Sequence, residues 1–168
     1  MHIKIRPEQP EDAQCIDELT VAAFLEAPHT DHTEQFIVRA LRNSNALSVS
    51  LIAEDNGYIV GHVALSPVVI SDGSDHWYGL GPLSVLPNCQ NKGIGSKLME
   101  AAIQALDQIG AYGCVLLGDP CYYHRFGFSP KEGLMLSGVP AEYFQALVIQ
   151  GDVPQGEVSY HESFLAKD

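Results

Sequence analysis

The sequence predicts one α/β (α+β) domain over residues 1–168, and three observations carry this prediction. Short alternating apolar and polar runs, bounded by turn residues, indicate strands. Apolar residues that recur at three- and four-residue steps indicate helices between some of these strands. The composition, 46% hydrophobic and 18% charged among 168 residues, is sufficient for one buried core and argues against disorder.

The N-terminal half shows five elements. In chain order they are a strand at 2–6, a helix at 10–25, a helix at 33–41, and strands at 47–54 and 58–66. Ala27-Pro28 separates the two helices. Asn56-Gly57 accepts positive φ at turn positions, so it predicts a hairpin between the last two strands.

The C-terminal half alternates strand and helix after a turn at 71–75. The predicted elements are a strand at 77–85, a helix at 93–109, a strand at 114–117, a helical turn at 121–127, an extended segment at 128–136, a helical patch at 142–147 and a strand at 157–160. No internal repeat, linker or low-complexity segment divides the chain.

The loop Gln90-Asn91-Lys92-Gly93-Ile94-Gly95 joins the strand at 77–85 to the long helix that follows. This order leaves free backbone N–H groups at a helix N-terminus, where the aligned peptide dipoles favour an anion. Gly93 and Gly95 have no Cβ, so a phosphate could approach the backbone closely. The strand–loop–helix unit therefore predicts a pyrophosphate site.

Two common phosphate motifs do not fit this loop. A P-loop requires Lys-Ser/Thr after its second glycine, whereas Gly95 is followed by Ser96-Lys97 in the opposite order. A dinucleotide fingerprint requires a third small residue where Leu98 stands, and an acidic ribose partner about 20 residues further on. No clean acidic partner follows, so the loop belongs to another class.

Two motifs carry a family resemblance. Gln90-x-x-Gly93-x-Gly95 after Leu83-x-Val85-x-Pro87 resembles the acetyl-CoA motif of the GNAT superfamily of N-acetyltransferases. Tyr123-x-x-x-Gly127-Phe128 resembles the segment after the fifth strand of that superfamily. The fuller run Tyr-Tyr-x-Arg-Phe-Gly-Phe is similar to the YhbS-like branch of predicted acetyltransferases, and the resemblance covers residues 2–136.

The resemblance implies a GNAT fold. Its central sheet is mixed, mostly antiparallel and flanked by helices, and it splays between the superfamily's strands four and five, here 77–85 and 114–117. Gly79 and Gly81 could admit the kink or bulge that the splay needs. Residues 137–168 would then form a C-terminal extension on the acceptor side of a single N-acetyltransferase domain.

The resemblance also implies acetyl-CoA as the cosubstrate and a primary amine that attacks it directly in a ternary complex. The backbone N–H of Val85 is expected to stabilise the developing oxyanion, and Tyr123 is expected to protonate the leaving thiolate. Lys92 and Lys97 would add positive charge for the phosphates. The residues expected to bind acetyl-CoA are Leu83, Ser84, Val85, Gln90, Asn91, Lys92, Gly93, Ile94, Gly95, Ser96 and Tyr123.

The general base is left between two candidates. His62 has a suitable intrinsic pKa, and Glu34 stands on the helix that borders the acceptor site in GNAT folds. Simple packing or solvation roles are the alternatives for both. Cys121 offers a ping-pong route through an acyl-cysteine. The chain could also be an acyl-CoA-binding sensor or regulatory module without turnover, or a structural partner that keeps only the fold.

The charge and the apolar patterning limit the partners. Nine Lys and Arg against 21 Asp and Glu give a net charge of −12, which argues against nucleic-acid and anionic-membrane surfaces. No apolar run is long enough to span a membrane, and the N-terminus lacks a signal-peptide pattern. We therefore expect a cytoplasmic protein with a small-molecule or peptide amine as its partner; a homodimer is compatible with the sequence.

The cysteines and the possible metal ligands indicate neither a disulfide nor a metal site. The four cysteines are scattered and contain no C-x-x-C pair, so reduced thiols are expected. His29, Asp31 and His32 lie at the start of a helix, where Asp31 is expected to act as the N-cap, with Glu34 closing a capping-box-like pair. No metal is expected.

Overall fold

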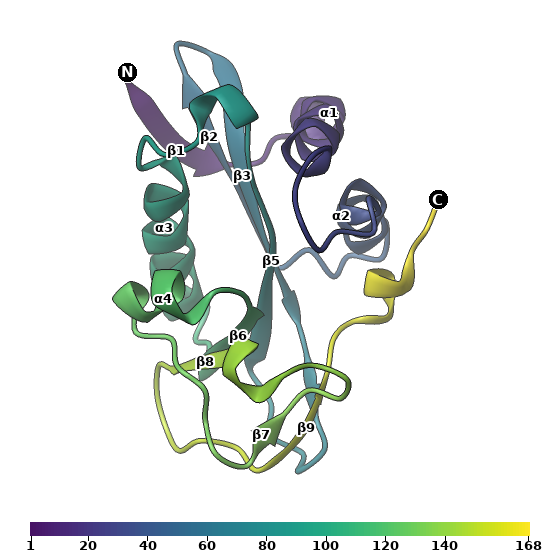
Figure 1. The fold of residues 1–168 in the computed structure, drawn as a ribbon, viewed down its shortest axis with the longest axis vertical. Helices are drawn as coiled ribbons and strands as arrows, with labels where there is room; N and C mark the ends of the chain where they lie inside the picture. Colours follow the sequence, from purple (N-terminus) through teal and green to yellow (C-terminus); the bar gives the residue numbers. More distant parts are fainter.

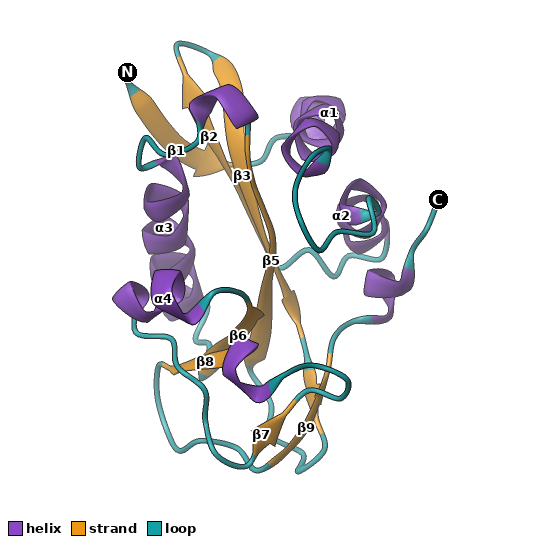
Figure 2. Ribbon diagram, in the orientation of Figure 1, coloured by secondary structure: helices purple, strands orange, loops and turns teal.

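The computed structural model describes residues 1–168, which form nine strands, four α-helices and several short 3₁₀ turns (Figures 1 and 2). The strands are β1 (Ile3–Pro7), β2 (Val49–Asp55), β3 (Tyr58–Pro67), β4 (Val69–Ile70), β5 (Trp77–Val85), β6 (Gly113–Leu117), β7 (Leu134–Met135), β8 (Phe144–Val148) and β9 (Gly156–Ser159). The helices are α1 (Ala13–Phe24), α2 (Glu34–Asn43), α3 (Ile94–Gln108) and α4 (Pro120–Tyr123), and a short 3₁₀ turn, η5 (Glu162–Leu165), lies near the C-terminus.

The main sheet has six strands in the order β1-β2-β3-β5-β6-β8. All neighbouring pairs are antiparallel except β5 and β6, which run parallel. Helix α3 covers one face, and α1 and α2 lie on the other (Figure 1). A small sheet, β4-β9-β7, lies at the end of the molecule away from α1. This mixed, mostly antiparallel sheet between helices confirms the predicted fold class.

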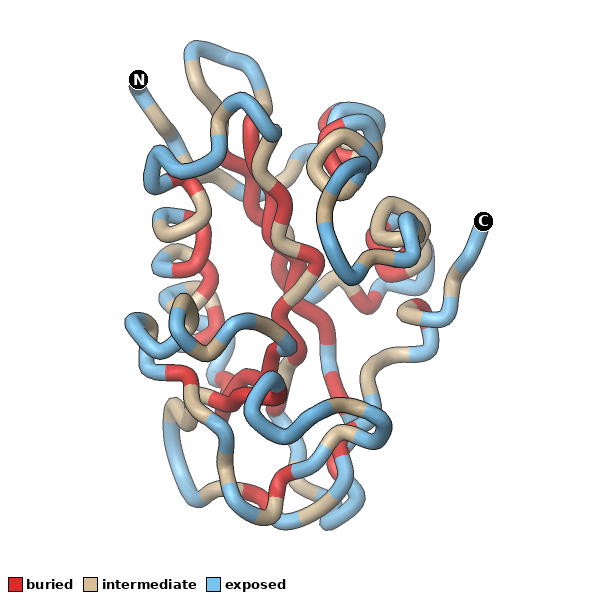
Figure 3. Tube along the Cα trace, in the orientation of Figure 1, coloured by how far each residue is buried: buried red, intermediate tan, exposed pale blue.

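The β2–β3 hairpin follows from its turn residues. Asn56 and Gly57 both have positive φ, 49° and 84°, as a two-residue hairpin turn of the predicted kind requires. The hairpin aligns β3 with β5 in the centre of the sheet, where β3 is buried from Val60 to Ser66. The centre of the sheet is therefore buried between the layers that cover its two faces (Figure 3).

Helix α3 contributes one face to the largest apolar cluster. The fully buried residues Leu98, Met99, Ala102 and Leu106 recur at helical spacing and pack against the apolar side chains of the sheet. Burying a side chain of this size typically stabilises a fold by about 2 kcal/mol. The packing fixes the helix N-terminus, and the loop before it, against the end of β5 (Figure 1).

The C-terminal segment differs from the sequence prediction. The helical patch predicted at 142–147 is wrong beyond its first residues: Ala141–Tyr143 forms a 3₁₀ turn, but Phe144–Val148 is strand β8, which pairs with β6. Phe144 and Ala146 are buried in the second apolar cluster, so sheet pairing and burial override the local helical preference. The extended segment predicted at 128–136 contains only one short strand, β7. The strand predicted at 157–160 is present as β9.

The start of α2 also differs. The helix begins at Glu34 with Thr33 as its N-cap and no side-chain cap, so Asp31 is not the capping residue. Glu34 instead accepts a hydrogen bond from the Thr30 hydroxyl. Thr30 thereby orients the Glu34 carboxylate from the loop before the helix.

None of the helices combines the length and apolar character that a bilayer span requires.

Candidate active site between strands β5 and β6

Strands β5 and β6 pair over only three residues each and then separate. Trp77, Tyr78 and Gly79 align with residues 113–115. Beyond Gly79, β5 continues to Val85, and β6 continues through Leu117, without further pairing to each other. The sheet therefore opens at the carboxyl ends of two parallel strands, as predicted for residues 77–85 and 114–117.

Glycines allow both the paired part of β5 and β6 and the part where the two strands separate. An added Cβ at Gly113 would come within 2.3 Å of the Trp77 ring, and one at Gly79 within 2.5 Å of the Tyr160 ring. Both glycines thus admit aromatic rings at the paired end. The register of β3 against β5 shifts opposite Gly81, whose φ is 139°. Of the two glycines predicted to admit a kink or bulge, Gly81 therefore lies at the bulge, whereas Gly79 makes room for the Tyr160 ring.

The backbone of β5 presents alternate residues to the opening. The N–H of Leu86 donates to the carbonyl of Val60, so the backbone groups of Ser84 and Leu86 face β3. Because backbone groups alternate sides along a strand, those of Leu83 and Val85 face the space that β6 leaves. The Gln90 side chain donates to the Val85 carbonyl at 3.1 Å, and the Val85 N–H remains directed at the opening.

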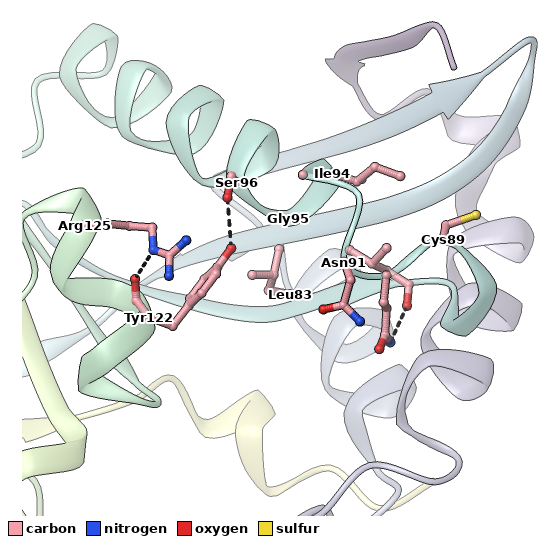
Figure 4. A pocket seen from close by; sticks show the side chains of 11 residues that line it. Leu83, Cys89, Asn91, Ile94, Gly95, Ser96, Tyr122 and Arg125 are labelled. Carbon is pink, nitrogen blue, oxygen red and sulfur yellow. Dashed lines mark hydrogen bonds between the residues drawn. The ribbon is translucent and has the colours of Figure 1, made fainter.

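A cleft of about 590 Å³, which we name the loop cleft, lies along this side of β5 (Figure 4). It is bounded by the end of β5, the loop before α3, the first turn of α3 and the segment of α4. Its lining residues are Leu83, Val85, Cys89, Gln90, Asn91, Gly93, Ile94, Gly95, Ser96, Tyr122 and Arg125. Eight of the eleven residues predicted to bind acetyl-CoA line it.

The loop exposes unpaired amides to this cleft. Gly93 has a φ of 84° and is the N-cap of α3, but no side chain caps the helix. The first intrahelical hydrogen bond runs from the Lys97 N–H to the Gly93 carbonyl, so the amides of Ile94, Gly95 and Ser96 have no intrahelical acceptor. These donors and the positive end of the helix dipole favour an anion.

Tyr122 and Arg125 form the opposite side of the loop cleft (Figure 4). The Tyr122 hydroxyl lies 3.3 Å from the Ser96 Oγ, at the first turn of α3. The Arg125 side chain donates to the Tyr122 carbonyl at 2.9 Å, and its guanidinium carbon lies 4.6 Å from the centroid of the Tyr122 ring. This places a permanent positive charge opposite the free amides.

Sequence reasoning missed Arg125 and Tyr122, although both belong to the Tyr-Tyr-x-Arg-Phe-Gly-Phe run. The spacing of three residues on a short helical turn places the two side chains on one face, and this was the available signal. Lys92 and Lys97, which were expected to supply the positive charge, are exposed and line neither this cleft nor the next one.

A second cleft, of about 400 Å³, lies where β5 and β6 separate; we name it the apolar cleft. Its lining residues are Phe24, Glu34, Ile37, Leu80, Gly81, Pro82, Leu83, Leu116, Leu117, Tyr123, Tyr160 and Phe164. Leu83 also lines the loop cleft, so the two spaces adjoin at this residue. Glu34 contributes the one charged side chain.

Tyr122 and Tyr123 are adjacent, yet they line different clefts. Their ring centroids are 4.9 Å apart and the ring planes meet at 88°, and the Tyr122 hydroxyl lies against Ser96. The Tyr123 ring lies over Gly118, where an added Cβ would come within 2.2 Å of it. Burial, together with Tyr122 and Asp119, raises the pKa of Tyr123 to about 12. The phenol is therefore protonated at neutral pH.

Three other candidates lie outside both clefts. The His62 ring is fully buried, its Nε2 lies 2.8 Å from the Ser50 Oγ, and burial lowers its pKa to about 4. Its ring lines neither cleft. The Ser84 side chain is also buried, with its Oγ unpaired. Cys121 is exposed and lines neither cleft, which removes the geometry that an acyl-cysteine route would need.

Comparison with known proteins identifies the family. Residues 13–128 match the acetyltransferase (GNAT) family. The chain is 35% identical over 125 residues to YhbS of Escherichia coli K12, named as an uncharacterized N-acetyltransferase, and the match covers 74% of this chain and 72% of YhbS. YjhQ of the same organism, named in the same way, is 30% identical over 145 residues, covering 84% and 77% of the two chains.

Two solved structures share the fold across nearly the whole chain. A GNAT family acetyltransferase from Brucella melitensis, in complex with acetyl-CoA, is 47% identical with a TM-score of 0.87, covering 97% of this chain and 98% of that one. YhbS from Escherichia coli, in complex with CoA, is 33% identical with a TM-score of 0.88, covering 98% and 93%. The chain therefore belongs to the GNAT acetyltransferase family.

Proposed function

We propose that this protein transfers the acetyl group of acetyl-CoA to a primary amine by direct attack in a ternary complex. One observation carries the proposal: a cleft lined by helix amides and a cleft lined by apolar side chains adjoin at Leu83, where β5 and β6 separate. The relatives crystallised with acetyl-CoA and with CoA support the identity of the first ligand.

The loop cleft fits a pyrophosphate. The uncapped amides of residues 94–96 donate to phosphate oxygens, and Arg125 supplies a cation from the opposite side. The backbone of Leu83 is free to bond the pantetheine amides along the edge of β5. Gln90 holds the Val85 carbonyl from within the loop cleft. Acetyl-CoA supplies the activated acetyl group.

The chemistry is proposed for the junction of the two clefts. The Val85 N–H donates to the thioester carbonyl and stabilises the oxyanion that develops as the amine nitrogen bonds to the carbonyl carbon. The carbon–sulfur bond then breaks, and Tyr123 gives its proton to the departing thiolate. The apolar surroundings that raise the pKa of Tyr123 also raise that of a thiol in the same space, so the proton transfer remains feasible.

Glu34 is the proposed acceptor for the proton that the ammonium must lose before attack, directly or through water. It lines the apolar cleft, whereas His62 lies in the core. The attacking nitrogen loses one proton before attack and a second as the amide forms. The thiolate takes up one proton, so each turnover releases one proton to solvent.

Calorimetric titration of acetyl-CoA into the wild-type protein and a Gly95→Val variant tests the cofactor site. Gly95 has ordinary helical geometry and faces the loop cleft, where an added Cβ would lie 3.3 Å from the Tyr122 hydroxyl. We expect at least about a 100-fold loss of affinity, because the side chain fills the place of a phosphate. Gly93→Val is less suitable, because φ at Gly93 is positive.

Unchanged affinity in Gly95→Val, with the thermal unfolding of the fold retained, would place acetyl-CoA elsewhere. A parallel assay of thiol release with a panel of amines separates two functions. Amine-dependent release supports a transferase. Tight binding without release with any amine would instead favour an acyl-CoA-binding sensor.

A further inference from the structure

The apolar cleft is assembled from segments that meet only in the folded chain. Phe24 comes from the end of α1, Glu34 and Ile37 from the first turns of α2, and Phe164 from η5. Helix α2 and η5 lie side by side, and Phe164 packs against the buried face of α2 (Figure 1). The C-terminal segment thus closes one side of the cleft.

The lining is poor in charged groups. Nine of its twelve residues are hydrophobic, and none is Lys, Arg or His. The rings of Tyr160 and Phe164 lie 5.0 Å apart and form an aromatic edge. A space of about 400 Å³ with such walls suits a small ligand with an apolar or aromatic body.

Glu34 is the one charged group in this lining, and Thr30 holds its carboxylate in place. A carboxylate has lone pairs for more than one donor, so it can also accept from a ligand ammonium. The cleft has no cation that could pair with a carboxylate on the ligand. It also has no anion besides Glu34 that could pair with a second ammonium on the ligand. Unpaired charges are costly to bury, so either would weaken binding.

We propose that the acceptor is a primary monoamine on an apolar aryl or alkyl body without a carboxylate, with Glu34 as its ammonium partner. This inference rests on the proposed function and names the substrate class of the same site. The net charge of −12 acts in the same direction, because it attracts cations and repels anionic acceptors.

The test uses the full-length protein at saturating acetyl-CoA with three acceptors. 2-Phenylethylamine fits the proposal, L-phenylalanine adds a carboxylate to the same skeleton, and spermidine adds further ammonium groups. We expect kcat/KM for 2-phenylethylamine to exceed that of the other two by at least about tenfold. Equal or better use of L-phenylalanine or spermidine would overturn the proposal.

Glu34→Gln keeps the shape of the side chain and removes its charge. We expect KM for 2-phenylethylamine to rise by about tenfold or more, while the Kd of acetyl-CoA stays unchanged. Asp31→Asn is the matched control, because Asp31 is a nearby carboxylate outside both clefts. Equal effects of the two variants would mean that general charge, and not Glu34, attracts the amine.

Direct binding distinguishes a failure of this inference from a failure of the proposed function. Titration of 2-phenylethylamine into the protein loaded with CoA reports on the apolar cleft without turnover. Binding that Glu34→Gln weakens supports the inference. Failure to bind this amine, in a protein that binds acetyl-CoA and acetylates another acceptor, overturns the inference and leaves the proposed function standing. Failure to bind acetyl-CoA overturns the proposed function, and the inference with it.

Discussion

The two clefts that meet at Leu83 are built in opposite ways. The loop cleft takes nine of its eleven lining residues from one stretch, 83–96, and offers mainly backbone donors and one guanidinium. The apolar cleft draws on α1, α2, β5, β6, α4 and the C-terminal segment, and offers mainly side chains. A site made of backbone geometry can be recognised in a short motif, whereas a site made of distant side chains depends on the tertiary fold.

The largest effect is expected from Tyr123→Phe, at the boundary between the two clefts. The change removes the proposed proton donor and keeps the ring, so turnover should fall by about 10²–10⁴-fold. The Kd of acetyl-CoA should barely change, because Tyr123 lines only the apolar cleft. Steady-state kinetics and calorimetry measure the two quantities separately.

Tyr122→Phe is the matched control for this change. Tyr122 lines only the loop cleft, and its hydroxyl contacts Ser96. This variant should alter the Kd of acetyl-CoA modestly and keep most of kcat. The reversed pattern, with Tyr122→Phe inactive and Tyr123→Phe active, would show that Tyr122, and not Tyr123, donates the proton.

A smaller effect is expected from Arg125→Gln. Removing the cation that faces the α3 amides should weaken acetyl-CoA binding by about tenfold and reduce its dependence on salt. Lys92→Gln and Lys97→Gln serve as controls, because both lysines are exposed and lie outside the lining. If either lysine variant matches Arg125→Gln in calorimetry, the positive charge of the loop cleft is diffuse and not local.

The smallest effect on activity is expected from His62→Gln, because the ring lines neither cleft. Its effect should instead be on stability. Burial lowers the pKa of His62 to about 4, against 6.5 for the free side chain, while Glu8 opposes this shift and Arg42 reinforces it. Between these pH values the unfolded chain binds a proton that the folded chain does not, so stability falls as the pH is lowered.

Protonation of His62 in the unfolded chain should lower the free energy of unfolding by about 2 kcal/mol between pH 7 and pH 5. Urea unfolding at the two pH values should therefore show a smaller drop in the free energy of unfolding for His62→Gln than for the wild type. An identical drop in both proteins would mean that His62 titrates normally. Unchanged kcat and KM in the variant would separate it from the active site.

Local signals accounted for much of the fold. Asn56-Gly57 specified its hairpin, Gly93 specified the start of α3, and the central strand 77–85 has the predicted bounds. The helical patch predicted at 142–147 was wrong beyond Tyr143, because its helical pattern is local, whereas pairing with β6 depends on a partner about 30 residues away.

The candidate site divides in the same way. Glycine spacing and the proline at 87 indicated the loop cleft, because helix amides need no particular side chain to bind an anion. No short motif links Phe24, Glu34 and Phe164, which meet only when α2 packs beside η5. The burial of His62 could not be predicted from the sequence either, since a histidine on a strand can face either the core or solvent.

Leu83 implies a thermodynamic linkage between the two proposed ligands. It borders both clefts, so a ligand that fixes Leu83 from one cleft would change the surface that Leu83 presents to the other. Any free energy gained or lost in this way is reciprocal: the factor by which acetyl-CoA changes the affinity for the amine is also the factor by which the amine changes the affinity for acetyl-CoA.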